Sequence, residues 1–415
     1  MKFEPIIKSL LETDLYKFSM GQAIFHNASK YKTTWSFKCR NKDVKFTLEM
    51  VQEIKEQIKA FCNLRFTEDE LNYLKSISWL DESYIDYLHN FAPNFKHIFI
   101  GMYSECGLSI ETRGTWLETS MYEIPILAIV NEVYFRSQDN FDELLKESKR
   151  RTDKKFESLV DGKYYLSSFS EFGLRRRLCA EAQEYVVKKF IYLNKTMSKS
   201  TFVGTSNVYL AKKYSEFGVR PVGTMAHEWI MCMGQGTFGV DPLTSNDYAL
   251  KVWVKEYGKK NGIALTDTLG TKLFNLDFSD ALASVFDGVR HDSGDPIKWG
   301  EMEIEHFKSL GIDPLTKTLL FSDSLDFERA DRIANHFKNK AKVAFGIGTF
   351  LSNDTYMKPL NIVMKVTECN GKDVAKISDS EGKGMCKNPE YVDWLKKGIS
   401  LRLMYSEKDW DILEV

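Results

Sequence analysis

The chain has 415 residues, of which 43% are hydrophobic and 28% are charged, a composition typical of a folded protein and unlike that of a disordered chain. The formal net charge of -1, from 57 basic and 58 acidic residues, provides no overall attraction for nucleic acid or for an anionic membrane. No stretch approaches 18 uninterrupted apolar residues, and acids and lysines interrupt the N-terminal apolar positions, so we expect neither a membrane span nor a signal peptide. The seven cysteines contain no C-x-x-C pair, which favours reduced thiols in the cytoplasm.

The first part of the chain mixes helices with antiparallel strands. The stretch ETDLYKFSMGQAIFH predicts an amphipathic helix capped by Thr13 or Asp14. Residues 33–40 and 98–119 alternate apolar and polar side chains between turn signals, as antiparallel strands do, whereas residues 48–76 are predicted to be helical. From residue 121 a continuous apolar stripe predicts a further helix, and a strongly charged helix follows it.

From about residue 164 the chain follows a β/α rhythm. Short apolar runs end near residues 167, 203, 223, 266, 289, 321 and 345, and most precede a helical stretch. This spacing predicts a parallel sheet that is either closed into a barrel or wound open. In six of the seven units a carboxylate, Asn or His follows the strand, and the last unit supplies Gly and Thr. Because the carboxyl ends of parallel strands meet on one face, we expect a functional site there.

The part of the chain from residue 356 leaves this rhythm. The stretch LNIVMKVTECNGKDVAKISDS predicts a β-hairpin with Asn-Gly at its tip. Such antiparallel strands can return to the N-terminal sheet. We therefore predict an N-terminal α/β sandwich domain at residues 1–130, a catalytic α/β barrel at residues 131–355, and a C-terminal segment, residues 356–415, that completes the first domain.

Two loops that follow predicted strands can contact phosphate or sugar groups. In FGIGTF the backbone amides can face a phosphate, although a tight strand-to-helix turn uses the same residue types. In FSDSLD a hydroxyl and a carboxylate suit ribose or magnesium-bound water, although Ser and Asp are also common helix caps. The candidate residues for these contacts are Ser322, Asp323, Gly346, Gly348 and Thr349.

The stretch VRHDSGDP combines an arginine and a carboxylate in one loop. Arg290 and Asp292 are two residues apart and a glycine follows, which favours an anionic or hydroxylated ligand. Asp295, and likewise Asp326 in the next unit, is instead expected to cap a helix.

Two further stretches leave their chemistry open at this point. EFGLRRR supplies Arg175, the arginine nearest the strand end, for a pocket, although three arginines commonly mark a solvated helix face. Phe172 is either a core residue or stacks on a flat heteroaromatic ring. In GTMAHEW, His227 lies between a strand end and a helix start, where it is a packing residue, a general base or something less usual.

The combined motifs resemble those of one enzyme family. TDLYKFSM, FGLRRR, GTSN, GTMAHEW, VRHDSGDP, FSDSLD and FGIGTF, in this order over about residues 12–350, are similar to the motif series of the nicotinate phosphoribosyltransferase family. The resemblance implies an irregular α/β barrel joined to an α/β sandwich domain, in a homodimer with shared active sites. It also implies that nicotinate and 5-phosphoribosyl 1-pyrophosphate give nicotinate mononucleotide and pyrophosphate in NAD salvage, coupled to ATP hydrolysis and assisted by Mg²⁺.

The resemblance also assigns roles to individual residues. His227 is the residue that takes the γ-phosphate of ATP and later loses it as free phosphate, and neutral imidazole is a competent nucleophile for that step. Arg290 and Asp292 are the other catalytic candidates. No direct protein ligand to the metal is expected, because Mg²⁺ is held through pyrophosphate and waters. The implied substrate contacts are Tyr16 from the partner subunit, Phe172, Arg175, Thr205, Asn207, Asp267 and Ser293.

Asn207 bears on the choice of substrate, because relatives that use nicotinamide carry an aspartate at the corresponding position. A neutral amide can donate to the carboxylate of nicotinate, whereas an aspartate would repel it. His291 replaces the proline or glutamine of many relatives and is expected to point out of the pocket or to be a second histidine at the site. Two alternatives stay open: the same fold acting on nicotinamide or quinolinate, and a phosphate-ligand-binding barrel without catalysis that serves as a sensor or scaffold.

Overall fold

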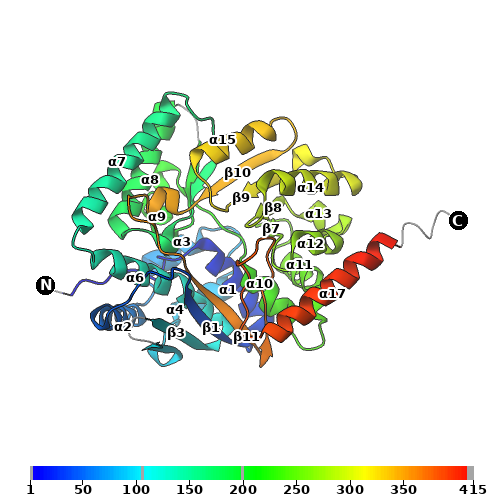
Figure 1. Ribbon diagram of the computed structural model, residues 1–415, viewed down its shortest axis with the longest axis horizontal. Helices are drawn as coiled ribbons and strands as arrows, with labels where there is room; N and C mark the ends of the chain where they lie inside the picture. Colours follow the sequence, from blue (N-terminus) through cyan, green and yellow to red (C-terminus); the bar gives the residue numbers. More distant parts are fainter. Residues whose placement is uncertain (1–2, 104–106, 198–200, 409–415) are drawn as a thin grey trace.

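The computed structural model describes residues 3–103, 107–197 and 201–408. Within these residues the strands form one parallel sheet of seven strands and one antiparallel sheet of five. The two sheets occupy different parts of the molecule (Figure 1). The predicted fold class, an irregular α/β barrel with a second domain built from both ends of the chain, is therefore confirmed.

The antiparallel sheet joins the N-terminal and C-terminal parts of the chain. Its strands are β1 (Lys32–Cys39), β2 (Ile98–Met102), β3 (Leu108–Thr115), β11 (Ile362–Cys369) and β12 (Lys372–Asp373). Their order is β12-β11-β1-β3-β2, so the C-terminal hairpin pairs directly with β1. Asn370 and Gly371 form the tip of that hairpin with positive φ angles, as the Asn-Gly pair predicts.

The parallel sheet contains all seven strands of the predicted β/α rhythm. They are β4 (Phe169–Glu171), β5 (Phe202–Thr205), β6 (Arg220–Pro221), β7 (Ile263–Leu265), β8 (Gly288–His291), β9 (Thr318–Phe321) and β10 (Lys342–Ile347). Their order in the sheet is β6-β5-β4-β10-β9-β8-β7. This order places β6 and β7 at the two edges, and the sheet curls so that these edges approach each other and form an incomplete barrel. The hydroxyl of Thr224, just after β6, donates to the backbone oxygen of Ile263 in β7 over 2.8 Å, which links the two edges through a side chain.

Helices cover both sheets. Those of the first part are α1 (Leu15–Ala28), α2 (Leu48–Cys62), α3 (Glu68–Lys75), α4 (Glu82–His89), α5 (Trp116–Thr119) and α6 (Glu123–Arg136). Those that follow are α7 (Phe141–Val160), α8 (Ala180–Met197), α9 (Val208–Lys213), α10 (His227–Trp229), α11 (Ser245–Tyr257), α12 (Thr271–Asp277), α13 (Asp280–Val285), α14 (Pro296–Ser309), α15 (Phe327–His336), α16 (Thr349–Ser352) and α17 (Pro389–Lys408).

Several helix starts follow from local sequence. The helical region predicted at residues 48–76 is two helices, because Thr67 and Glu70 form a reciprocal capping box that begins α3. Asp295 and Asp326 cap α14 and α15 by accepting hydrogen bonds from backbone amides, as predicted. Asp14 occupies the cap position of α1, although its side chain accepts no capping hydrogen bond from that helix.

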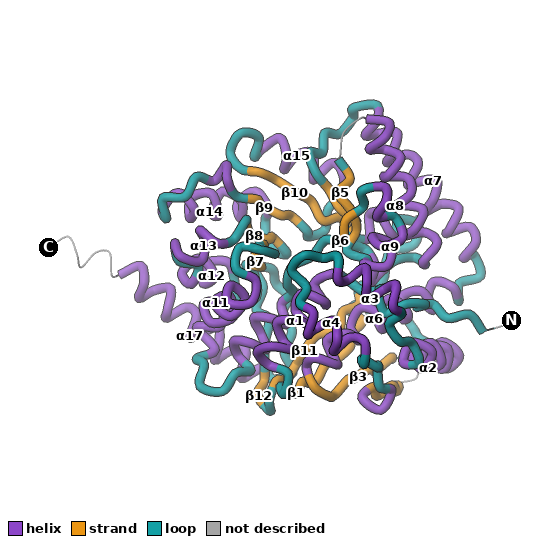
Figure 2. Tube along the Cα trace, turned by 180° about the vertical axis from the view of Figure 1, so that it is seen from behind, coloured by secondary structure: helices purple, strands orange, loops and turns teal. Residues whose placement is uncertain are grey.

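Helices α1 and α6 connect the two sheets. Every residue of α6 from Glu123 to Val133 is buried, and a helix that is enclosed on all sides belongs to the core. Figures 1 and 2 both place α1 between the sheets, where the backbone amide of Leu15 donates to the oxygen of Ser206, after β5, over 2.9 Å. The predicted boundary at residue 130 lies inside α6, and the division into segments 1–130, 131–355 and 356–415 stays a prediction.

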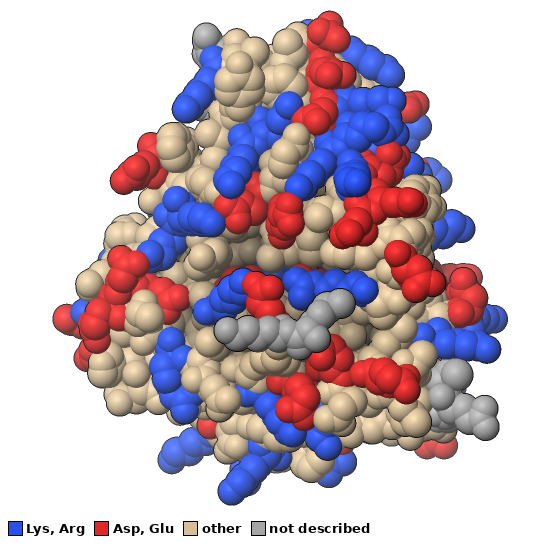
Figure 3. Space-filling model, turned by 90° about the vertical axis from the view of Figure 1, so that its left-hand side faces the viewer, with Lys and Arg blue, Asp and Glu red and all other residues tan. Residues whose placement is uncertain are grey.

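The surface agrees with the near-zero net charge. On the face shown in Figure 3, acidic and basic side chains are interspersed, and on α7 Glu147 pairs with both Arg150 and Arg151. No helix within the described ranges is both long and apolar enough to cross a membrane. The six described cysteines are unpaired, and the seventh, Cys106, lies outside the described residues.

Candidate active site

The ends of β6, β7 and β8 bring one histidine and two carboxylates together. His227 begins α10, shortly after β6, and its side chain is buried with a relative exposure of 5%. Its Nε2 lies 2.8 Å from Oδ1 of Asp267, after β7, and 3.5 Å from Oδ2 of Asp292, after β8. These residues are about 25 to 65 positions apart in the chain, and the parallel sheet places them at one rim.

The C-terminal segment completes this cluster, which the sequence pattern did not predict. Lys376 reaches the rim, and its Nζ lies 3.0 Å from Oδ2 of Asp267 and 3.7 Å from Oδ2 of Asp292. Ser293 donates from Oγ to Oδ2 of Asp267 over 2.5 Å, and Ser378 donates to the Oγ of Ser293 over 2.9 Å. The stretch AKISDS was assigned only to the returning C-terminal segment, because nothing in a lone lysine indicates which distant carboxylate it will contact.

The charges at the rim keep His227 neutral and the carboxylates ionised. Burial, together with the positive charge of Lys376, lowers the pKa of His227 to about 4. Burial opposes the ionisation of both aspartates, but their neighbours outweigh it. His227 and Lys376 hold the pKa of Asp267 well below its usual value, and Lys376, His227 and Arg290 hold that of Asp292 at about 2. A neutral ring can donate from Nε2 to Asp267 and keep its lone pair at Nδ1, the nitrogen that does not contact Asp267.

A second part of the rim carries donors for an anion. Arg290 is only 9% exposed, and its Nε has no hydrogen-bond partner among the described residues. A buried guanidinium N–H without a partner is rare, so this one indicates a ligand contact. Ser322 donates from Oγ to Oδ1 of Asp292 over 3.1 Å, and Asp323 pairs with Lys383 over 2.5 Å. The structure therefore brings the predicted residues of the β8 and β9 loops together.

The glycine loop lies against the predicted aromatic residue. A Cβ atom at Gly346 would lie 2.3 Å from Cδ2 of Phe172, so only glycine allows this ring to approach the strand. The backbone amide of Phe172 donates to the oxygen of Ile347 over 2.8 Å, which fixes the two segments to each other. Gly348 and Thr349 continue this loop into the start of α16.

Tyr16 and Arg175 interact within the same chain. Both are partly buried, and despite the cost of burial the pKa of Arg175 is raised by its negatively charged neighbours, among them Asp14, Glu123 and Asp292. Asp292 also belongs to the His227 cluster, so Arg175 lies within electrostatic range of the rim. The predicted reach of Tyr16 into a partner subunit stays a prediction.

Asn207 and Thr205 have structural partners that the sequence reasoning missed. The side-chain oxygen of Asn207 caps α9, and its amide nitrogen donates to Gln183 over 3.1 Å. Thr205 donates to Glu171 over 2.6 Å, and burial raises the pKa of this glutamate to about 7. Gln183 uses one of the two N–H donors of the Asn207 amide, so the predicted contact with the carboxylate of nicotinate stays a prediction.

His291 packs against aromatic side chains. It is buried between the rings of Trp299 and Phe321, with centroid separations of 5.2 and 5.8 Å. Burial lowers its pKa, which keeps the ring neutral in this apolar setting. The two possibilities that the sequence left open, a side chain that points out of the pocket and a second histidine at the site, stay predictions.

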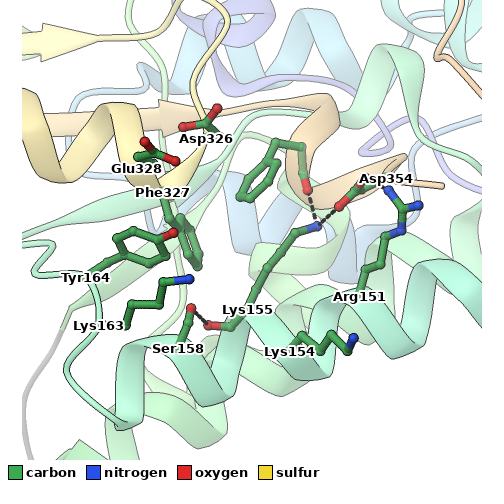
Figure 4. Close-up of a pocket in the computed structure, with 11 residues that line it drawn as sticks. Arg151, Lys154, Lys155, Ser158, Lys163, Tyr164, Asp326, Phe327, Glu328 and Asp354 are labelled. Carbon is green, nitrogen blue, oxygen red and sulfur yellow. Dashed lines mark hydrogen bonds and ion pairs between the residues drawn. The ribbon is translucent and has the colours of Figure 1, made fainter. Parts of the chain in front are cut away.

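A cavity of about 340 Å³ lies between α7 and the start of α15 (Figure 4). It is lined by side chains of α7, the start of α15 and Phe350, the residue after Thr349. Lys155 donates to the backbone oxygen of Phe350 and pairs with Asp354 over 2.7 Å, and Arg151 pairs with the same carboxylate over 2.7 Å. None of the predicted site residues lines this cavity. The contacts of Lys155 and Arg151 at its wall instead fix α16 and the residues just after it.

Comparison with known proteins assigns the family. Residues 167–401 match the model of the nicotinate phosphoribosyltransferase (NAPRTase) family, and residues 11–131 match the model of the NAPRTase N-terminal domain. The chain belongs to the NAPRTase family. The first match contains the His227 cluster and the glycine loop, and the second contains Tyr16.

Similarity to individual NAPRTase family members extends over nearly the whole chain. The nicotinate phosphoribosyltransferase of Bordetella pertussis is 42% identical over 95% of this chain and 96% of its own length, and that of Ralstonia nicotianae is 40% identical over 94% and 98%. Among solved structures, the nicotinate phosphoribosyltransferases of Vibrio cholerae and Porphyromonas gingivalis superimpose with TM-scores of 0.86 and 0.84, at 33% and 32% identity. The Vibrio cholerae match covers 98% of this chain and 98% of that protein, and the Porphyromonas gingivalis match covers 95% of this chain and 100% of that protein.

The His227 cluster of this NAPRTase family member also has the spacing of a cation site. His227, Asp267 and Asp292 offer one ligand atom each within 4.8 Å of one another. The ammonium group of Lys376 already contacts both carboxylates and supplies the positive charge there. Asp323, just after β9, is partly exposed. Within the described residues, Lys383 is its only ion-pair partner.

Proposed function

We propose that this chain is a nicotinate phosphoribosyltransferase that joins nicotinate to 5-phosphoribosyl 1-pyrophosphate in NAD salvage. The observation that carries the proposal is the buried Nε of Arg290, a donor without a partner in the described protein, at the strand ends that also hold Asp292 and the glycine loop. An anionic substrate would satisfy this donor. The names of the full-length relatives support the identity of that substrate.

The proposed transfer is a displacement at C1 of the ribose. The ring nitrogen of nicotinate attacks C1, and the N–C bond forms as the C–O bond to pyrophosphate breaks. No general base is required, because the pyridine nitrogen carries a free lone pair. The protein therefore contributes position and electrostatic stabilisation: Phe172 and Tyr16 hold the ring, and Arg175 and Arg290 face the anionic groups.

Magnesium enters this proposal with the phosphate groups of the substrates. Asp292 and Asp323 are both partly exposed and offer carboxylate oxygens at neighbouring strand ends, the type of group that holds magnesium through its waters. When bound, the ion neutralises charge on the leaving pyrophosphate. Asp267 is directed to His227 and Lys376 instead.

We also propose that ATP drives the reaction through a phosphohistidine at His227. Nε2 donates to Asp267 over 2.8 Å, which leaves the lone pair at Nδ1 as the nucleophile. The N–P bond forms as the bond between the β,γ-bridging oxygen and the γ-phosphorus breaks, and ADP leaves; water later releases the phosphate. The new charge at the rim can alter how tightly the substrates and products bind.

The proposal includes the homodimer and the cytoplasmic location that the motif resemblance implies. The unpaired state of the six described cysteines supports a reducing compartment. Sedimentation of the purified chain tests the dimer directly.

The function is tested by mixing the purified chain with 5-phosphoribosyl 1-pyrophosphate and one of three pyridines. We expect pyrophosphate and a mononucleotide with nicotinate, and far less of either with nicotinamide or quinolinate. ATP should increase the yield, and His227→Ala should abolish this increase while retaining some ATP-independent turnover. Preference for another pyridine would reassign the substrate, and an inactive chain that binds the phosphoribosyl donor would support the sensor alternative.

A further inference from the structure

One charged side chain at the rim has no part in the transfer described so far. Lys376 belongs to the C-terminal segment, yet its side chain is 7% exposed and contacts both Asp267 and Asp292. It lies about 150 residues after His227 in the chain. A buried ammonium group is costly unless it is paired, so its position at this carboxylate pair requires a reason.

The backbone around Lys376 is fixed to the strand ends. Lys376 exchanges two backbone hydrogen bonds with Met385, each of 3.1 Å, and the amide of Ile377 donates to the oxygen of Thr268 over 2.8 Å. The amide of Asp379 donates to Oγ of Ser293 over 3.0 Å. The lysine is therefore held in place by its own segment and does not reach the rim as a free surface side chain.

We propose that Lys376 is a positioning residue for the phosphorylation of His227. Its ammonium group holds Oδ2 of Asp267, so that Oδ1 accepts the Nε2 hydrogen of His227 and the ring stays neutral with Nδ1 available for attack. Lys376 acts through Asp267 and does not itself touch ATP in this role. The inference rests on the proposed function, because it gives the histidine its reactive form.

The charge balance supports this role. With a neutral ring, Asp267, Asp292 and Lys376 together carry a charge of -1; without the ammonium group they carry -2. A second net negative charge beside the imidazole favours its protonation, and imidazolium has no lone pair with which to attack phosphorus. Other charged groups near the rim are Arg290 on β8, Asp323 after β9, and Asp379 and Lys383 on the C-terminal segment.

The test compares Lys376→Met with Lys376→Arg and with a matched control, Lys372→Met. Lys372 lies on the same segment, but its Nζ donates to the backbone of Thr237 over 3.0 Å and contacts no site residue. The rate of phosphohistidine formation from ATP is measured in a single turnover between pH 6 and pH 9. We expect this rate to be nearly independent of pH over this range for the unmodified chain, Lys376→Arg and Lys372→Met.

For Lys376→Met we expect a rate that is about fourfold lower at pH 6 than at pH 9, which corresponds to a histidine midpoint that has risen to about 6.5. A loss of rate that is equal at all pH values, with no recovery in Lys376→Arg, indicates a merely structural role and overturns the proposal. A flat profile at the unmodified rate also overturns it.

A second measurement separates this inference from the proposed function. The ring of His227 is titrated by NMR in histidine-labelled protein, with His227→Ala for assignment. We expect the midpoint to rise from about 4 toward or above 6.5 in Lys376→Met only. If ATP phosphorylates none of the chains, ATP coupling fails while the titration still decides whether Lys376 sets the state of the imidazole; an unchanged midpoint refutes that role.

Discussion

Replacing His227 by glutamine should reduce the sensitivity of the fold to acid. The pKa of His227 is lowered from 6.5 to about 4 by burial and by Lys376, so the unfolded chain takes up a proton at this position well before the folded chain does. Above pH 6.5 the ring is neutral in both states and has no effect on the pH dependence. As the pH falls from 6.5 to 4, protonation favours the unfolded state, and the free energy of unfolding decreases.

The magnitude follows from these two pKa values. The linkage relation gives a loss of roughly 2 kcal/mol in the free energy of unfolding between pH 7 and pH 5, and about 3 kcal/mol by pH 4. Glutamine does not titrate, so the variant lacks this loss. Any stability lost through the missing hydrogen bond to Asp267 affects the variant at both pH values and cancels in the comparison.

The assay is urea denaturation of both proteins at pH 7 and pH 5. We expect the unmodified chain to lose roughly 2 kcal/mol more than His227→Gln between the two pH values. His89→Gln is the matched control, because it removes an exposed histidine of α4. If His227→Gln and the unmodified chain show the same pH dependence, the imidazole is not held neutral and the reasoning is wrong.

Three further predictions concern the rim. Gly346→Ala forces its new methyl group against the ring of Phe172, at 2.3 Å before any shift, and should raise KM for nicotinate several-fold with a smaller effect on kcat; an unchanged KM contradicts the proposed stacking. Asp267→Asn removes the negative charge that orients His227 and fixes its tautomer, and it should slow phosphohistidine formation by about 10² to 10⁴, measured as acid-labile phosphate, with ATP-independent transfer retained. Asn207→Asp should lower the melting temperature and not create activity with nicotinamide, because this side chain has structural partners; a gain of that activity would restore its role in selectivity.

Much of the fold follows from local sequence signals. Short apolar runs that end in polar turns predict the parallel strands, and all seven strands end within a few residues of the predicted positions. The hairpin tip at Asn370 and Gly371 and the caps at Asp295 and Asp326 depend on the backbone preferences of a few adjacent residues. Such features need no knowledge of distant partners, so the sequence alone predicts them.

The features that escaped prediction all depend on long-range contacts. Lys376 meets Asp267 only because the C-terminal segment crosses the barrel rim, and Thr224 links β6 to β7 only because the sheet curls. Asn207 also caps a helix and donates to Gln183, a structural role that the resemblance did not indicate. Residue type alone does not distinguish a side chain that binds a ligand from one that already has a partner within the protein.

The most direct test of the account is ³¹P NMR of the ¹⁵N-histidine-labelled chain after exposure to ATP. We predict a single phosphorus–nitrogen coupling that belongs to Nδ1 of His227, because Nε2 donates to Asp267. The signal should be absent in His227→Ala. Phosphate on Nε2, on another residue, or on none would contradict the arrangement of the rim on which the proposed ATP coupling depends.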